Sequence, residues 1–375
     1  MALGKLVAGI VAALVIGALI GFGVARLAGP AATTTYTTVY TATYTTTATY
    51  TTAYTTTVTK LYTPYPLAIA DALNRTVIFN APPSTVVSLA PDITQALVAL
   101  GLCGRIIGLD QYSYQLLNEL NLTSCLPKGF EVIEVNTMSP TGYNADAILL
   151  LRPQLVLADA GFDAMWASNL PSLQKYGIKV FFLKGTSAHT IKQIEEDVVV
   201  LGEVFGVPEE AQAVVGWMNK TLASLPPVKP SSVAFVVWVN PDGSFYAAGG
   251  GTFIDDEIKA AGGVNALGNY SGWGPFEPSV LLAANPQIIV LTSMGLGDNC
   301  TAVRAALSQI PGVAETAAYK SGSIYVVTGM AENAIEEPSV LSVYGVEILH
   351  EVLAGEAPHC ITTQWAAKAL NMTLP

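Results

Sequence analysis

Residues 85–110 read TVVSLAPDITQALVALGLCGRIIGLD. The short apolar run at 85–90 predicts a buried strand, Pro91 and Asp92 predict a turn, and the apolar spacing at 93–100 predicts a helix. The next apolar run, at 105–110, predicts a second strand. A strand, a helix and a second strand in this order are typical of a parallel βαβ unit.

The same alternation of predicted strands and helices recurs in both halves of the chain. It predicts an α/β fold of two Rossmann-like lobes with parallel sheets, bridged by one long helix. We place the N-terminal lobe at 67–207, the bridging helix at 208–229 and the C-terminal lobe at 230–375. The predicted strands are 155–158, 179–183, 233–239, 287–291 and 323–327, and the predicted helices are 145–151, 170–176, 191–205, 208–225, 254–261, 280–284 and 341–353.

The composition excludes two broad classes of protein. Hydrophobic residues make up 51% of the 375 residues and charged residues 12%, so the chain can bury a large core and general disorder is excluded. The formal net charge is −11, and residues 1–66 contain three cations and no acid, so residues 67–375 carry −14. This acidic body argues against binding to nucleic acid, which requires a basic surface.

The N-terminus predicts the compartment. Twenty uncharged residues from Leu6 to Ala25 are enough to cross a membrane as a helix, and residues 1–32 are interpreted as a membrane anchor or a cleaved signal segment. The anchor is favoured because the run exceeds the usual length of a signal-peptide core. Gly17-x-x-x-Gly21 would allow two such helices to pack, so self-association is an open possibility. We therefore expect the body on the extracellular face of the membrane.

A low-complexity segment follows at 33–66. Between Thr33 and Lys60, seventeen of twenty-eight residues are Thr and five are Tyr, and no large aliphatic side chain is available for a core. We expect an extended stalk, with threonine hydroxyls that could carry sugars. The alternative is a strand-forming segment that pairs with a neighbouring chain, since Thr, Tyr and Val favour strands.

Glycosylation sequons and cysteines agree with an extracellular body. Six N-x-[ST] triplets begin at Asn74, Asn121, Asn219, Asn269, Asn299 and Asn371. The four cysteines allow three pairings. The pairing that keeps each bridge within one half of the chain joins Cys103 to Cys125 and Cys300 to Cys360, and four free thiols are the alternative.

Four blocks of sequence resemble the substrate-binding proteins of ABC importers for cobalamin and ferric siderophores, the class III periplasmic-binding proteins. The blocks are VVSLAPDIT at 86–94 with its continuation to 109, NADAILLLRPQLVLA at 144–158, LQKYGIKV at 173–180, and VLLAANPQIIVL at 280–291. The resemblance covers about residues 77–353. It implies two lobes around a ligand cleft, a stiff helix between them, and delivery of a metal chelate to an ABC transporter permease.

The candidate ligand-binding residues are aromatic and lie on predicted loops at the carboxyl ends of strands, where α/β lobes bind ligands. Core packing is the alternative for each of them. The resemblance supports Tyr112 and Trp273 in particular, because cobalamin-binding members carry aromatic residues in comparable places. The candidates are Tyr112, Trp166, Trp238, Phe245, Tyr246 and Trp273.

The charge of the chain favours one ligand class. Beyond residue 66 there are four arginines, Arg75, Arg105, Arg152 and Arg304, so few cations remain to bind an anionic siderophore. A corrinoid is therefore favoured, with a ferric siderophore or haem next. A surface structural or adhesive module that reuses the fold is the alternative function.

No catalytic or metal-binding motif accompanies the binding-protein pattern. The three histidines, at 189, 350 and 359, lack the spacing of a zinc site, and no nucleophile–base pair, P-loop or H-E-x-x-H occurs. We expect no metal site, no cofactor and no enzymatic activity.

The resemblance also implies docking to the permease through one acid on each lobe. In the first lobe the position falls on Asp146. In the second it falls on Ser279, which is not an acid, and Glu277 lies two residues earlier. The alternative is that both acids simply complement helix N-termini.

Overall fold

The computed structural model describes residues 38–45, 51–58, 65–136, 142–161, 170–292 and 299–375. The predicted anchor, Leu6–Ala25, lies outside these residues. Among the described residues, no helix has both the length and the apolar character needed to span a bilayer.

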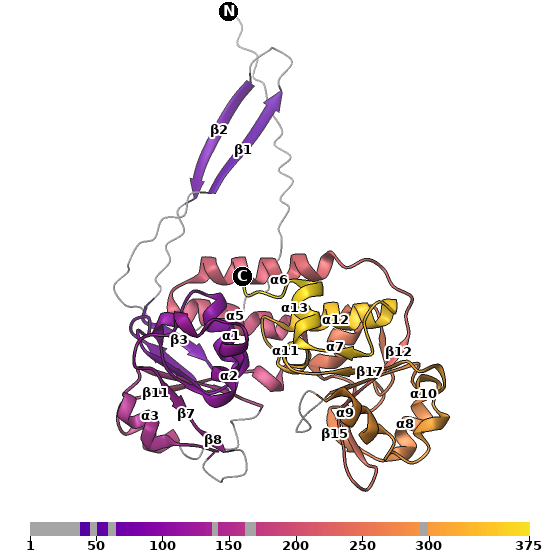
Figure 1. Ribbon diagram of the computed structural model, residues 1–375. Coiled ribbons are helices and arrows are strands. Elements are labelled where there is room, and N and C mark those ends of the chain that lie inside the picture. The colour runs from indigo at the N-terminus through magenta and orange to yellow at the C-terminus, as the bar shows by residue number, and fades with distance from the viewer. Residues whose placement is uncertain (1–37, 46–50, 59–64, 137–141, 162–169, 293–298) are drawn as a thin grey trace, which may run out of the picture.

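The N-terminal lobe is built on a five-stranded sheet in which every neighbouring pair is parallel, as predicted (Figure 1). Its strands, in spatial order, are β11 (Lys179–Leu183), β10 (Leu155–Asp159), β5 (Val86–Ser88), β6 (Ile106–Asp110) and β7 (Glu131–Ile133). Its helices are α1 (Pro91–Ala99), α2 (Gln111–Glu119), α3 (Ala145–Leu151), α4 (Leu170–Gln174) and α5 (Ile191–Phe205). Two small antiparallel hairpins complete the lobe, β3 (Leu67–Ala70) with β4 (Thr76–Phe79) and β8 (Val135–Asn136) with β9 (Gly142–Tyr143).

The predicted βαβ unit at 85–110 forms β5, α1 and β6. Pro91 occupies the first turn of α1, where its missing N–H costs no hydrogen bond. Asp110 ends β6 and begins α2, because its side chain accepts hydrogen bonds from the backbone N–H groups of Tyr112 and Ser113.

The C-terminal lobe contains a seven-stranded sheet that is mixed, whereas a parallel sheet was predicted. Its main order is β15 (Trp273–Phe276), β13 (Phe245–Ala248), β12 (Ser232–Val239), β16 (Ile288–Thr292), β17 (Ile324–Val327) and β18 (Cys360–Ile361), and β14 (Val264–Asn265) also pairs with β12. Pairs β12–β13 and β13–β15 are antiparallel. The first of these pairs is antiparallel because the connection at 240–244 is too short for a parallel crossover.

Helices cover this second sheet as in the first lobe. They are α7 (Phe253–Ala260), α8 (Pro278–Ala284), α9 (Cys300–Leu307), α10 (Ala317–Ser321), α11 (Met330–Glu336), α12 (Ser342–Ala354) and α13 (Thr363–Leu370).

Helix α6 (Pro208–Ala223) links the lobes. It runs along one side of the molecule from above α5 toward the C-terminal lobe and packs against both α5 and α12 (Figure 1). One continuous apolar core therefore extends from Phe205 of α5 through Met218 of α6 to Leu349 of α12. This shared core holds the two lobes against a common support.

The Thr/Tyr-rich segment differs from the extended stalk that we expected. Its described residues form an antiparallel pair, β1 (Thr38–Thr45) with β2 (Thr51–Val58), in which Thr38 lies opposite Val58 and Thr45 opposite Thr51. The strand preference of Thr, Tyr and Val explains this pairing.

Candidate functional site

Three aromatic rings form a row on the C-terminal lobe. Trp238 ends β12 beside Tyr246 of β13, and their rings stack with centroids 4.2 Å apart and planes 4° apart. Tyr246 and Trp273 of β15 are also nearly parallel, with centroids 6.2 Å apart. Because antiparallel pairing places β13 between β12 and β15, residues far apart in the sequence join in one row. All three rings are half-buried, so each keeps an exposed part.

The aromatic row lies beside a contact between the lobes. Trp273 also contacts Phe253 at the start of α7, with centroids 5.6 Å apart. Just before α7, the carbonyl oxygen of Gly251 lies 2.6 Å from Nδ1 of His189 in the N-terminal lobe. Ile191 N, at the start of α5, donates a 2.9 Å hydrogen bond to Oδ2 of Asp256 in α7. These contacts place the row next to the junction of the lobes.

The other predicted ligand-binding residues are not part of this row. Tyr112 lies in the first turn of α2 on the N-terminal lobe and is 51% exposed. Phe245 is fully buried and packs against Phe276, so its ring belongs to the core; residues alternate along β13, and its neighbour Tyr246 points to the other face. Trp166 lies outside the described residues.

Carboxylates gather at the junction of the lobes, and the sequence reasoning missed them. These acids lie close enough for their charges to interact. In addition to burial, Asp159, Glu337 and Asp197 raise the pKa of Asp92, and Asp110 contributes to the raised pKa of Glu337. We call these five the interlobe carboxylates. A usable signal existed in the sequence, because Asp110 and Asp159 stand at the carboxyl ends of two strands, where α/β folds bind ligands.

Local hydrogen bonds fix several of these carboxylates. Asp159 accepts from the backbone N–H of Gly161 at 2.6 Å and of Thr186 at 2.8 Å. Asp197 of α5 accepts from the backbone N–H of Gly185 at 3.0 Å. The loop after β11 is thus tied both to the end of β10 and to α5.

Burial opposes charge on the interlobe carboxylates. Desolvation, reinforced by nearby acids, raises the pKa of Asp92 well above its ordinary value, that of Asp197 to about 7 and that of Glu337 to about 8. Desolvation also raises the pKa of Asp110, although its hydrogen bonds with Ser113 and Tyr112 oppose the change. Such shifts are typical of functional sites.

Within the described ranges, no group of three or more His, Cys, Asp or Glu side chains has an arrangement that could hold a metal ion.

The predicted docking acids lie on separate lobes. Asp146 is exposed in the first turn of α3, and the side chain that caps this helix is that of Asn144. Glu277 is exposed at the start of α8, and its side chain makes no capping hydrogen bond. Helix α3 is followed by β10 and helix α8 by β16, and each helix runs back along its sheet before the strand that follows it. Both helix N-termini therefore lie at the carboxyl ends of the strands, the same end as the interlobe carboxylates.

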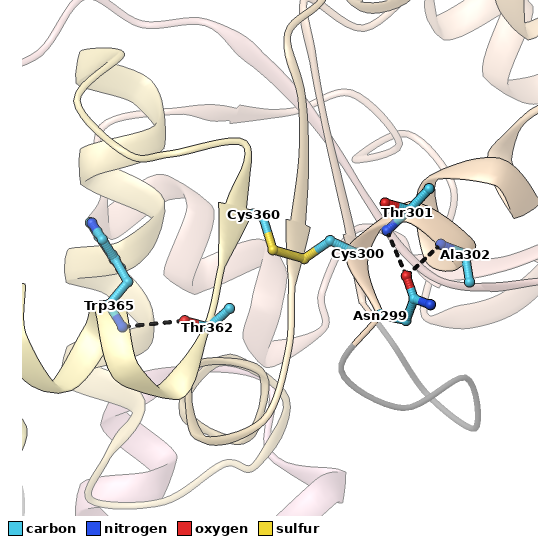
Figure 2. Close-up of a disulfide and its surroundings, with 7 residues drawn as sticks. All are labelled: Asn299, Cys300, Thr301, Ala302, Cys360, Thr362 and Trp365. Carbon is cyan, nitrogen blue, oxygen red and sulfur yellow. Dashed lines mark hydrogen bonds between the residues drawn. A yellow bond between two sulfur atoms is a disulfide. The ribbon is translucent and has the colours of Figure 1, made fainter.

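The two predicted disulfides are formed, Cys103–Cys125 and Cys300–Cys360. The second ties the start of α9 to β18 (Figure 2). In the same view, Oδ1 of Asn299 accepts hydrogen bonds from the backbone N–H groups of Thr301 and Ala302, which begins α9. All six sequon asparagines are exposed, which is compatible with the predicted glycosylation.

Two α/β lobes with side chains gathered where the strands of both lobes end have the architecture of a bilobal binding protein. The family model described as periplasmic binding protein matches residues 86–330, more than half of the chain, and the chain belongs to this family.

Individual relatives agree with this assignment. A cobalamin-binding protein of Halobacterium salinarum is 26% identical over 282 residues, which cover 73% of this chain and 70% of the relative. An uncharacterised ABC transporter substrate-binding lipoprotein of Bacillus subtilis is 26% identical over 233 residues, which cover 61% of this chain and 69% of the relative.

Among solved structures, the fold is similar to that of a periplasmic haem-binding protein from Roseiflexus sp. RS-1. Its TM-score is 0.58 at 21% identity, with 73% of this chain and 99% of the other covered. A protein of an Fe3+-hydroxamate transport system from Saccharomonospora viridis gives a TM-score of 0.58 at 21% identity, with 77% and 99% covered.

Proposed function

We propose that this protein is the extracellular substrate-binding subunit of an ABC importer, and that it captures a corrinoid and hands it to a permease without converting it. The observation that carries the ligand class is the row of Trp238, Tyr246 and Trp273 beside the lobe junction. Half-buried parallel rings provide an apolar surface for a large, rigid macrocycle. The cobalamin-binding relative from Halobacterium salinarum supports the same choice.

The positions of the arginines support a corrinoid over an anionic chelate. Arg75 pairs with Asp71, and Arg105 donates to the carbonyl oxygen of Pro83. Arg152 is exposed at the end of α3, and Arg304 is exposed in the last turn of α9. None of these four is placed at the aromatic row, where a carboxylate or catecholate ligand would require a positive partner.

Direct titration tests the ligand class. The full chain in detergent is titrated with a cobalamin, with haem and with a ferric hydroxamate, while tryptophan fluorescence is recorded. We expect the cobalamin to bind most tightly, and Trp273→Ala to weaken it about tenfold, since losing a stacked ring costs about 1.4 kcal/mol. Trp365→Ala in α13 is the matched control and should retain wild-type affinity. Tighter binding of haem or of the hydroxamate would reject the corrinoid.

We also propose that residues 1–32 anchor the protein, so that the body faces the outside of the membrane. Deleting residues 1–32 should release the protein from sedimented membranes, and the full-length mass should include the N-terminus. A mass that begins after Ala32 would instead identify a cleaved signal segment. The comparisons give no support to the adhesive alternative.

A further inference from the structure

The interlobe carboxylates come from both lobes and face one junction. Asp92, Asp110, Asp159 and Asp197 belong to the N-terminal lobe, and Glu337 follows α11 in the C-terminal lobe. Asp110 and Asp159 end β6 and β10, and Asp92 follows β5, which lies between those two strands in the sheet. These three acids therefore share the sheet edge at which α/β proteins bind their ligands.

Positive charge at this junction does not balance the acids. Lys184 is the cation that lowers the pKa of Asp197, and its ammonium group already forms an ion pair with Glu196. The neighbouring helix α11 contributes a further acid, Glu336, whose Oε1 accepts a 2.7 Å hydrogen bond from Thr292. The junction thus carries ionisable acids on both of its sides.

A second observation points to a missing donor. Asp92 is only 6% exposed, and its Oδ1 has no hydrogen-bond partner. It lines a small cavity of about 10 Å³, together with Asp197 of α5 and Ser339 of the other lobe, and this is close to the space that one water-sized group requires. A buried carboxylate oxygen without a donor costs free energy, so a donor is expected when the site is filled.

We propose that the interlobe carboxylates select the charge of the imported ligand, which presents a cationic group to Asp92 and Asp197 in the cleft. This inference rests on the proposed function, because it assumes that the lobe junction is where the imported chelate binds. Opposite charge favours the ionised carboxylates, so a cationic ligand is attracted and an anionic one is rejected. The sign of the ligand charge, more than its chemical family, then determines affinity.

Cobinamides test this inference without changing the ligand scaffold. Aquocobinamide is cationic and dicyanocobinamide is neutral, so the two differ in axial ligands and charge. We expect the full chain to bind the cationic form at least tenfold more tightly at low salt, and this preference should shrink as NaCl is added. Asp92→Asn and Asp197→Asn should each reduce the preference severalfold, because each weakens binding of the cationic form more than binding of the neutral form. Glu356→Gln, an exposed acid beyond α12, is the control and should retain the preference.

Proton release provides a readout in the unmodified protein, so the test does not depend on the variants folding. Because burial, reinforced by neighbouring acids, keeps protons on the interlobe carboxylates, a cationic ligand should displace these protons, whereas a neutral ligand should not. Calorimetry at pH 7.5 in buffers of different ionisation enthalpy measures the number of protons released on binding. Equal affinity for the two cobinamides, or cationic binding with no proton release, would overturn the inference.

Ferric siderophores separate this inference from the proposed corrinoid function. If corrinoids fail to bind but a cationic ferric hydroxamate binds, and Asp92→Asn weakens it, the corrinoid assignment is wrong and the charge selection stands. Tight binding of an anionic tris-catecholate chelate or of haem would overturn the charge selection itself.

Discussion

Nδ1 of His189 lies 2.6 Å from the carbonyl oxygen of Gly251, and this contact joins the N-terminal lobe to the C-terminal lobe. A carbonyl oxygen can only accept, so Nδ1 carries the hydrogen and the ring donates it. The contact stands beside the aromatic row, in which Tyr246 of β13 lies three residues before Gly249 and Trp273 belongs to β15. The relative position of the lobes and the shape of the candidate site are therefore linked.

The first prediction concerns this contact. His189→Ala removes one interlobe hydrogen bond, which is worth about 0.5–1.5 kcal/mol, so the ligand-free lobes should separate more often. Small-angle X-ray scattering should show a larger radius of gyration. His359→Ala is a matched control, because Nδ1 of His359 contacts the carbonyl oxygen of Ile324 within one lobe. An equal expansion in both variants would contradict a specific role for His189.

The second prediction concerns the disulfides. The Cys103–Cys125 and Cys300–Cys360 bridges close loops with sequence separations of 22 and 60. In the chain-entropy model, removing them lowers the free energy of unfolding by about 3.4 and about 4.3 kcal/mol. Guanidinium denaturation of the two paired Cys→Ser variants measures both losses. A larger loss for the shorter loop would show that local packing outweighs loop entropy.

Docking to the permease gives the third prediction. Asp146→Arg combined with Glu277→Arg should weaken association with the permease about tenfold or more, because two exposed carboxylates lose their positive partners. Ligand affinity should not change, and the effect should be larger at low salt. Association is measured with the permease in nanodiscs, with Glu356→Arg as the charge-matched control. Unchanged association in the double variant would remove these acids from the docking surface.

The fourth prediction is a pH dependence of stability. Desolvation and nearby acids raise the pKa of Asp197 to about 7 and of Glu337 to about 8 in the folded protein. Between an ordinary carboxyl pKa of about 4 and these values, the folded state binds more protons than the unfolded chain. The free energy of unfolding should therefore fall as pH rises through this window.

Thermal denaturation of the ligand-free protein between pH 5 and pH 8.5 measures this trend, and we expect the higher Tm at pH 5. Asp197→Asn combined with Glu337→Gln should flatten the profile, whereas Glu356→Gln should not. A wild-type Tm that rises with pH would show that the carboxylates are stabilised in their charged form.

Local sequence was sufficient for much of the N-terminal lobe. The run from Val86 to Asp110 contains its own turn, at Pro91, and its own helix cap, at Asp110, so strand, helix and strand follow from neighbouring residues. The disulfide pairing was also predictable, since each cysteine pairs with the one nearest in its half of the chain.

The second lobe shows where this reasoning fails. A run such as FYAA at 245–248 predicts a strand but not its direction, which depends on the connection at 240–244 and on the partner strand. The two faces of β13 also decide that Tyr246 joins the aromatic row while Phe245 enters the core. The pairing of β1 with β2 depends likewise on contacts between separate segments.

The sequence by itself determined the two α/β units, the acidic body and the resemblance to a family, because strand and helix periodicity and composition are local properties. Only the tertiary structure brought Asp92, Asp197 and Glu337 to one junction, and only it stacked Trp238, Tyr246 and Trp273 in one row. These side chains are separated by many residues in the chain. Their approach depends on strand order and on the packing of α6 across both lobes, which are long-range properties of the folded core.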